Sequence, residues 1–194
     1  MQTLTINNQV YEPKLNFAFY KQTRDDKFLK DGNSDGFSAV VNGLLEENVD
    51  MIVAVYYHSL AYYKRNQPTE DDVEAALEEL IFVDDDKTNQ AFADIFADLK
   101  AFGFLARKLS ESLKELNRNA DLIEKRINGM DDGTEKEKML TGLEYMQTQI
   151  EKLKQLLTGQ ESSPKPLASA SPSPISPSSP QMSSAPSAVA TNSI

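Results

Sequence analysis

The sequence contains no cysteine and a single histidine, His58. The absence of cysteine excludes a disulfide scaffold and thiolate metal sites, and one histidine excludes a multi-histidine metal site. The longest mostly apolar run, residues 51–63, is shorter than the roughly 20 residues that a bilayer-spanning helix needs. Residues 1–12 lack the basic and then apolar pattern of a secretory signal. We therefore expect a soluble, intracellular protein that does not bind membranes.

Common catalytic and nucleotide-binding motifs are also missing. Neither G-x-x-x-x-G-K-[ST] nor G-x-G-x-x-G occurs, so no phosphate-binding loop is indicated. His58 has no sequence context for a Ser-His-Asp triad, which favours a structural or interfacial role. Residues 84–89 suggest a calcium loop, but the central glycine is absent and Ile95 stands where a bidentate glutamate is required. We interpret these residues as a solvated linker and expect no enzyme activity, no cofactor and no metal.

Charge is distributed unevenly along this acidic chain, which has 20 basic and 30 acidic residues. Residues 1–100 carry 19 acidic and 9 basic side chains, whereas residues 101–160 carry ten of each. Most of the excess lies in residues 69–99, where Lys87 is the only basic residue. A chain this acidic, with dispersed basic residues, is a poor nucleic-acid binder. We interpret the acidic face over residues 70–86 first as a solvated face and second as an electrostatic docking site.

The C-terminal residues 161–194 differ from the rest in composition. They contain twelve serines and seven of the nine prolines, and they lack aromatic residues. Such a segment cannot bury enough apolar area to offset its ordering entropy. We predict a disordered, partly polyproline-like tail that acts as a solubilising segment, with a spacer or weak partner-binding role as the alternative.

Short elements are predicted at the N-terminus. Residues 3–11 alternate polar and apolar around Asn7-Asn8, which predicts a β-hairpin with a tight turn. Pro13 then blocks regular continuation. Residues 15–19 fit either a strand, by their alternation, or a short helix, which we favour.

Three helices are expected next. Residues 37–45 place their apolar side chains on one face. Residues 49–65 are apolar nearly all round, as in a helix that is central in a core or lies at an interface. Thr69 and Asp72 resemble a capping box that begins an amphipathic helix with an acidic outer face.

The longest regular pattern begins at Phe92. Its apolar residues follow spacings of three and four: Phe92, Ile95, Leu99, Phe102, Ala106, Leu109, Leu113, Leu116, Ala120, Ile123, Ile127 and Met130. This spacing predicts one helix, about 60 Å long if it is continuous. Within it, we interpret the step Phe102-Gly103-Phe104 as a close-packing point.

A glycine-containing loop at residues 128–133 interrupts the pattern, and Thr134 with Glu137 resembles a capping box. A second arm repeats the spacing up to Gly159, a plausible helix stop: Met139, Leu143, Met146, Ile150, Leu153 and Leu157. Two such arms predict an antiparallel helical hairpin whose leading part packs on the N-terminal domain. A parallel homodimeric coiled coil is the rival, although complementary flanking charges are lacking.

The predicted fold class is therefore mainly α. It comprises an N-terminal helical domain with a β-hairpin (1–88), a long helix and coiled-coil-like helical hairpin (89–158), and the Ser/Pro-rich tail (159–194). Two apolar groups are candidate partner-binding or self-association surfaces. The first group is Val53, Tyr56, Tyr57, Leu60 and Tyr63, and the second is Phe92, Ile95, Leu99 and Phe102.

The order of elements resembles a known family. The hairpin TLTINNQVYEPK precedes the Phe-rich LNFAFYKQ, and the apolar helices of DGFSAVVNGLLEENVDMIVAVYYHSLAYYKRNQPTEDDVEAAL follow. This pattern resembles the tail assembly chaperones of long-tailed phages (siphophages) of Gram-positive hosts. KRNQPTEDDVEAALEEL, with its helix end, proline, cap and acidic amphipathic helix, is especially typical. The resemblance covers roughly residues 1–99.

The resemblance implies a non-catalytic assembly factor. Such proteins bind the apolar, helical tape measure protein, keep it soluble and help recruit tail tube subunits. They are displaced as the tube grows, so we expect this chain in the cytoplasm of the infected host and not in the mature virion. The alternatives are a structural coiled-coil or scaffolding protein that uses residues 92–157 for self-assembly, and an acidic inhibitor that mimics nucleic acid.

Overall fold

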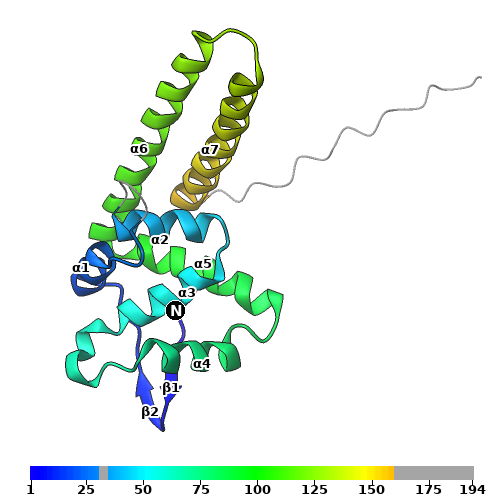
Figure 1. Cartoon of the computed structure of the whole chain (residues 1–194). Coiled ribbons are helices and arrows are strands. Elements are labelled where there is room, and N and C mark those ends of the chain that lie inside the picture. Colours follow the sequence, from blue (N-terminus) through cyan, green and yellow to red (C-terminus); the bar gives the residue numbers. More distant parts are fainter. Residues whose placement is uncertain (31–34, 160–194) are drawn as a thin grey trace, which may run out of the picture. The chain divides into compact units, whose positions relative to one another are not determined.

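A computed structural model describes residues 1–30 and 35–159 of the chain, and these residues form one compact unit. The described elements, in chain order, are β1 (Leu4–Ile6), β2 (Gln9–Tyr11), α1 (Phe17–Asp25), α2 (Gly36–Leu45), α3 (Val49–Ser59), the 3₁₀ helix η1 (Ala61–Asn66), α4 (Glu70–Leu80), α5 (Asp85–Ala101), α6 (Gly103–Asn128) and α7 (Thr134–Thr158). This confirms the mainly helical class with an N-terminal hairpin (Figure 1). The predicted disordered tail lies outside the described residues.

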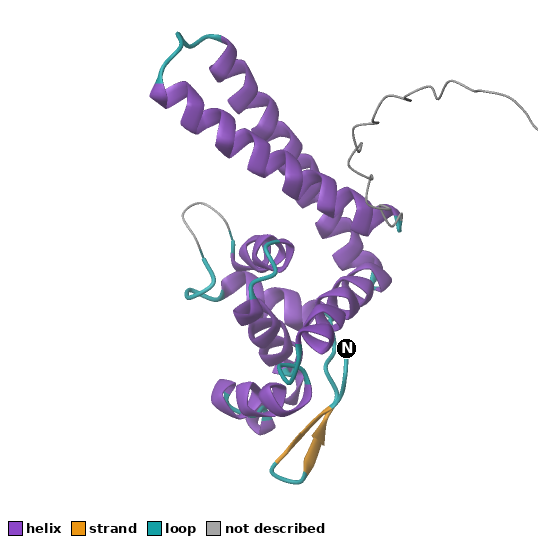
Figure 2. Cartoon of the chain, turned by 90° about the vertical axis from the view of Figure 1, so that its right-hand side faces the viewer, coloured by secondary structure: helices purple, strands orange, loops and turns teal. Residues whose placement is uncertain are grey.

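The predicted β-hairpin is confirmed. β1 and β2 pair antiparallel, with Leu4 opposite Tyr11 and Ile6 opposite Gln9. Asn7 and Asn8 both have positive φ angles, 51° and 62°, as a tight two-residue turn of the hairpin type requires. Leu4, Ile6 and Tyr11 are buried, and β1 packs against α4. The hairpin therefore packs on α4 and lies at one end of the helical domain (Figure 2).

The nearly all-apolar helix α3 is central, as its composition predicted. It contacts α1, α2, α4 and α5, and Ile52, Val55 and Tyr56 have at most 1% of their surface exposed. The predicted extension to residue 65 is wrong, because α3 ends at Ser59 and η1 follows. The Ser59 carbonyl accepts the backbone N–H of Lys14 at 3.1 Å, so a residue from the N-terminal segment takes the place of the next helical turn.

Acidic residues define the first turns of α4 and α5. The capping box of Thr69 and Asp72 is confirmed in both directions, and it begins α4. The interpretation of residues 84–89 as a solvated linker is wrong. Asp84 caps α5 by accepting the Lys87 backbone N–H at 2.7 Å. Acidic groups at a helix N-terminus also interact favourably with the helix dipole, so the run of aspartates specifies a helix start.

The predicted continuous helix is broken, which corrects both its length and the interpretation of Gly103. α5 ends at Ala101, Phe102 is extended (φ −90°, ψ 104°), and α6 begins at Gly103. A side chain at Gly103 would meet nothing within 4 Å, so this glycine is not a close-packing point. Leu99 of α5 and Leu105 of α6 are both fully buried in one core. Because the chain bends at Phe102, the apolar faces of α5 and α6 can both be buried in this core. A single straight helix could not place both faces there.

The antiparallel hairpin of α6 and α7, which we call the arm, is confirmed (Figure 1). Its base joins the main core through Leu105, Leu109 and Leu153. Its outer part has a second cluster that contains Ala120, Ile127, Leu143 and Ile150. Because α7 of the same chain covers α6, the apolar stripe is paired without a partner chain. The three-part domain division stays a prediction, and its boundary at 88/89 lies inside α5.

The ends of α7 differ in how well the sequence predicted them. Gly159 is left-handed (φ 70°) and stops α7, as expected. The predicted capping box of Thr134 and Glu137 is wrong, because Thr134 is already the first helical residue and Gly133 precedes it without a side-chain cap. No described helix is both long and apolar enough to cross a membrane.

Close packing of α1 on α2 generates a stability prediction. A β-carbon at Gly36 would lie 2.1 Å from the backbone oxygen of Thr23, which cannot move independently of α1. We expect Gly36→Ala to lower the free energy of unfolding by about 1–3 kcal/mol through overpacking. Gly142→Ala is the matched control: its β-carbon meets nothing within 4 Å, and alanine is favoured in a helix by about 1 kcal/mol. Urea unfolding followed by circular dichroism measures both, and equal stabilities would contradict the close approach.

Candidate partner-binding surface

Five of the nine residues proposed as partner-binding from the sequence lie inside the core. Each of them has at most 7% of its surface exposed: Tyr56, Leu60, Phe92, Ile95 and Leu99. The Tyr56 hydroxyl accepts the backbone N–H of Gln2 at 3.0 Å, and burial raises the pKa of Tyr56 to about 12. These residues hold the elements together, so a partner reaches them only if the helices separate.

Three further candidates, Val53, Tyr57 and Tyr63, are half-buried. The Tyr63 hydroxyl accepts the backbone N–H of Glu12 at 3.1 Å, while the neighbouring Tyr62 donates its hydroxyl to the Glu12 carbonyl at 2.7 Å. The two tyrosines therefore hold the backbone of the segment that joins β2 to α1. Tyr63 therefore holds in place the segment that forms part of the exposed surface described next.

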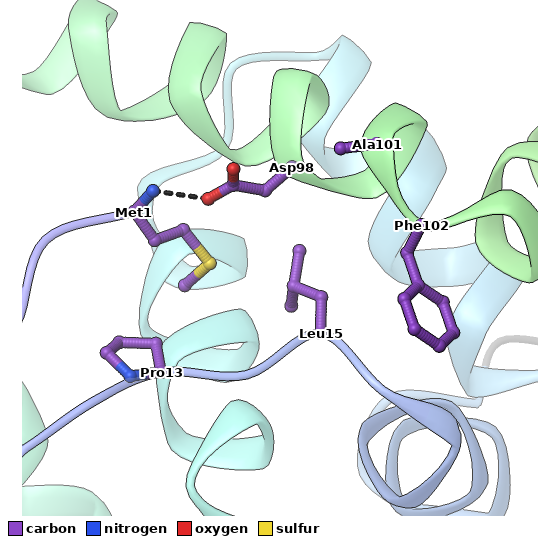
Figure 3. Close-up of a pocket in the computed structure, with 6 residues that line it drawn as sticks. All are labelled: Met1, Pro13, Leu15, Asp98, Ala101 and Phe102. Carbon is purple, nitrogen blue, oxygen red and sulfur yellow. Dashed lines mark hydrogen bonds and ion pairs between the residues drawn. The ribbon is translucent and has the colours of Figure 1, made fainter.

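The ninth candidate, Phe102, lies at the bend between α5 and α6 and is 42% exposed. Beside it is an open pocket of about 290 Å³ with both polar and apolar lining, formed by Met1, Pro13, Leu15, Asp98, Ala101 and Phe102. Figure 3 shows these side chains converging from the N-terminal segment and from the last turn of α5. The Asp98 carboxylate forms an ion pair with the Met1 α-amino group at the pocket wall.

Further aromatic side chains extend this surface along α1. Phe17 is 60% exposed, and its ring centre lies 5.4 Å from that of Phe104. Phe104 in turn packs edge-on against Tyr20 at 5.0 Å. Asn16 caps α1 by accepting the backbone N–H groups of Ala18 and Phe19, which fixes the helix start that carries Phe17. The elbow surface is the set Pro13, Leu15, Phe17, Ala101, Phe102 and Phe104.

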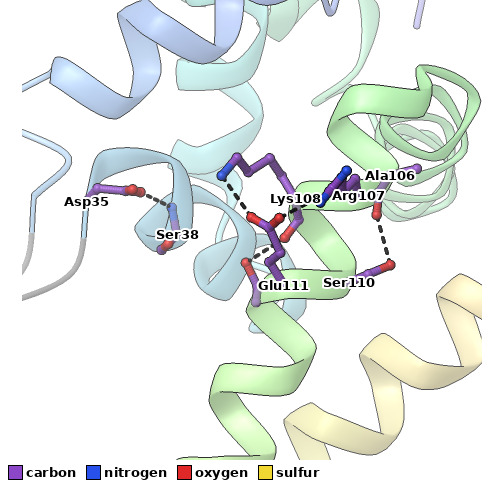
Figure 4. A network of polar contacts seen from close by, with 8 residues as sticks. Asp35, Ser38, Ala106, Arg107, Lys108, Ser110 and Glu111 are labelled. Atoms are coloured by element: carbon purple, nitrogen blue, oxygen red, sulfur yellow. Dashed lines mark hydrogen bonds and ion pairs between the residues drawn. The ribbon is translucent and has the colours of Figure 1, made fainter.

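A charged flank accompanies the elbow surface on α6. Lys108 lies over the Tyr20 ring, with its Nζ 5.6 Å from the ring centre, and it pairs with Glu111 at 2.8 Å. Arg107 reaches the same carboxylate at 3.4 Å, as Figure 4 shows. The hydrogen bond from Lys108 lowers the pKa of Glu111. Exposed pairs of this kind contribute little to stability, so they mainly make one side of the elbow surface polar.

The sequence pattern missed Phe17 as a surface residue because its spacing also fits a buried helix face. It also missed the partner of His58. The His58 Nε2 lies 3.0 Å from Oδ2 of Asp26, and both groups are largely buried. Burial lowers the pKa of His58 more than Asp26 raises it. The two residues are far apart in sequence, so no local signal could have paired them.

Within the described part of the chain, no group of three or more His, Asp or Glu side chains could hold a metal ion. What the elbow surface can do chemically is bury apolar side chains of another molecule. An exposed apolar surface of this kind is typical of a site that binds another protein.

Comparison with known proteins agrees with this class. The family model described as phage tail assembly chaperone protein, TAC, matches residues 3–114. The chain therefore belongs to the phage tail assembly chaperone family. No curated protein and no solved structure matches it.

The family match confirms the predicted resemblance at the level of the family. It establishes a role in phage tail assembly and partners among tail proteins, and it suggests a non-enzymatic role. Residues 3–114 extend from β1 into α6, and so they include the whole elbow surface. The outer part of the arm lies beyond the match.

Burial of His58 generates a pH prediction. Because its folded-state pKa is below the ordinary value of about 6.5, the unfolded chain binds a proton first as the pH falls. The contribution of neutral His58 to the free energy of unfolding is complete above about pH 6.5. It is lost as the pH falls through the folded-state pKa. We expect the free energy of unfolding to drop between about pH 7 and pH 5, and His58→Gln to remove part of this drop. Urea unfolding at several pH values measures it, and an unchanged slope in the variant would contradict the assignment.

Proposed function

We propose that this chain binds apolar helical segments of its phage's tape measure protein at the elbow surface and keeps them soluble during tail assembly. The observation that carries the proposal is the open pocket beside Phe102, whose lining residues other than Met1 lie within the family-matched residues. Such a pocket receives one large side chain of a helix, while exposed Phe17 adds contact area next to it. Each large apolar side chain that becomes buried contributes about 1.5–3 kcal/mol.

A tape measure protein needs such a partner for a physical reason. Long helices with uncovered apolar faces associate with one another unless another surface covers those faces. The formal net charge of −10 on the chaperone opposes association of the resulting complexes. This combination supports a role as a soluble, non-catalytic carrier.

The proposal extends to the later steps of assembly. The carrier helps to recruit tail tube subunits around the tape measure protein and is displaced as the tube grows. It therefore acts in the cytoplasm of the infected bacterium, a Gram-positive host of a siphophage, and it is absent from the mature virion. Self-association of the free carrier belongs to the same proposal, because an exposed apolar surface without a client favours contact with another copy.

The elbow surface generates a binding prediction. We expect Phe102→Ala combined with Phe17→Ala to weaken tape measure binding by about tenfold or more, because two anchors lose most of their buried area. Co-expression with the tape measure protein of the same phage measures the effect as the fraction of that protein that stays soluble. Isothermal titration with a soluble fragment of it gives the dissociation constant.

Val83→Ala is the matched control, because Val83 is 56% exposed and lies in the turn between α4 and α5, outside the elbow surface. The control should leave tape measure binding unchanged. Circular dichroism and the midpoint of thermal unfolding should show that both variants are folded at the temperature of the binding assay. Full solubilisation by the double variant would contradict the placement of the client on this surface.

A further inference from the structure

The helix α7 is seated on two other helices of the same chain. It lies along α6 and also contacts α2 (Figure 1). Leu153 of α7 is fully buried in the main core together with Leu105 and Leu109 of α6, and Leu113 of α6 packs against both this core and the outer cluster of the arm. We call the covered surface the α7 seat: Leu105, Leu109 and Leu113 of α6, and residues 45–47 at the C-terminal end of α2.

Polar contacts fix α7 to the C-terminal end of α2. Lys152 donates from Nζ to the carbonyl oxygen of Leu45 at 3.1 Å and pairs with the Glu47 carboxylate at 2.9 Å. Tyr145 donates its hydroxyl to the carboxylate of Glu46. The last carbonyl groups of a helix have no partner within that helix, and a cation there interacts favourably with the helix dipole. Lys152 therefore acts as a cap that α2 receives from another helix.

The sequence of α7 is not optimal for this seat. Gly133 precedes the helix without a side-chain cap, and Gly142 lies in the helix interior, where glycine is unfavourable. Gln149 is buried, and its Oε1 has no hydrogen-bond partner among the described residues. A buried acceptor without a partner retains its full desolvation penalty. We therefore expect a helix with an apolar side chain in the place of Gln149 to bind the seat more tightly than α7 does.

The α7 seat and α7 itself differ in their relation to the family. The match to tail assembly chaperones covers residues 3–114, which include the whole seat, whereas α7 lies entirely beyond that match. The part of the chain that defines the family thus carries a surface that receives a helix. In this chain, the helix that fills the surface comes from outside the matched residues.

We propose that α7 is a displaceable cover and that an amphipathic helix of the client takes its place on the α7 seat. The helix that fits has apolar residues at spacings of three and four, as Ile150, Leu153 and Leu157 have. It also carries a basic residue directly before one of them, as Lys152 precedes Leu153. Amphipathic helices dock in apolar grooves through such a face. The inference rests on the proposed function for the identity of the client, the tape measure protein, and it adds a second site that opens when α7 leaves.

Substitutions in α7 test the inference, because they alter the cover and leave the seat unchanged. Lys152→Ala combined with Tyr145→Phe removes the polar contacts to α2, so α7 should leave more readily. Gln149→Leu removes the unpartnered acceptor, so α7 should be held more firmly. The apparent affinity of a competing helix is proportional to the fraction of molecules whose seat is open. We expect this affinity to rise about tenfold in the double variant and to fall about tenfold in Gln149→Leu.

Two probes measure the affinity of the full chain for a competing helix. Fluorescence anisotropy of a labelled peptide with the sequence of residues 134–158 reports on the seat without the tape measure protein. A soluble fragment of the tape measure protein should then compete with this peptide. Lys154→Ala is the matched control, because Lys154 is exposed on α7, and it should leave both affinities unchanged. Circular dichroism checks that each variant is folded.

Three results would overturn the inference. The first is equal peptide affinity in the unaltered chain and in both α7 variants. The second is a dimer of the Lys152→Ala, Tyr145→Phe variant in sedimentation velocity, because α7 of another copy would then be the occupant. The third is a tape measure fragment that does not compete with the peptide. By contrast, full solubilisation of the client by the Phe17→Ala, Phe102→Ala variant would refute the elbow site alone, and the peptide affinities would still support the α7 seat.

Discussion

The bend at Phe102 is the constraint on which the rest of the fold depends. The stripes of α5 and α6 follow one uninterrupted spacing, but they are buried in the same core on either side of the bend. Burial of both apolar stripes in one core contributes more to the free energy of folding than one continuous helix would, because a single broken turn loses few hydrogen bonds. The bend also leaves Phe102 at the surface. A residue whose spacing predicts burial thus becomes part of a pocket.

The pocket depends on polar contacts from distant parts of the chain. The Ser59 carbonyl holds the backbone of Lys14, and the hydroxyls of Tyr62 and Tyr63 hold Glu12. These bonds position the segment between the hairpin and α1 against the last turn of α5. A similar arrangement, from His58 through Asp26, positions the exposed Phe28. Polar contacts between residues far apart in the chain therefore support both exposed apolar features.

Local signals predicted most elements of the fold. Asn7-Asn8 predicted the hairpin turn, Thr69 with Asp72 predicted the start of α4, and Gly159 predicted the end of α7. Two of the errors, the extension of α3 and the continuous helix through Phe102, arose where distant residues compete with the local pattern. Lys14 takes the Ser59 carbonyl and ends α3, and the shared core bends the chain at Phe102.

The sequence by itself determined the helical class, the paired arm, the acidic character and the family, because periodicity, caps and composition are local properties of the chain. Only the tertiary structure decided which apolar residues remain outside. Tyr56 and Phe102 are equally apolar in their sequence patterns, yet one is 1% and the other 42% exposed. Exposure depends on which helices meet, and that depends on contacts between residues far apart in the chain.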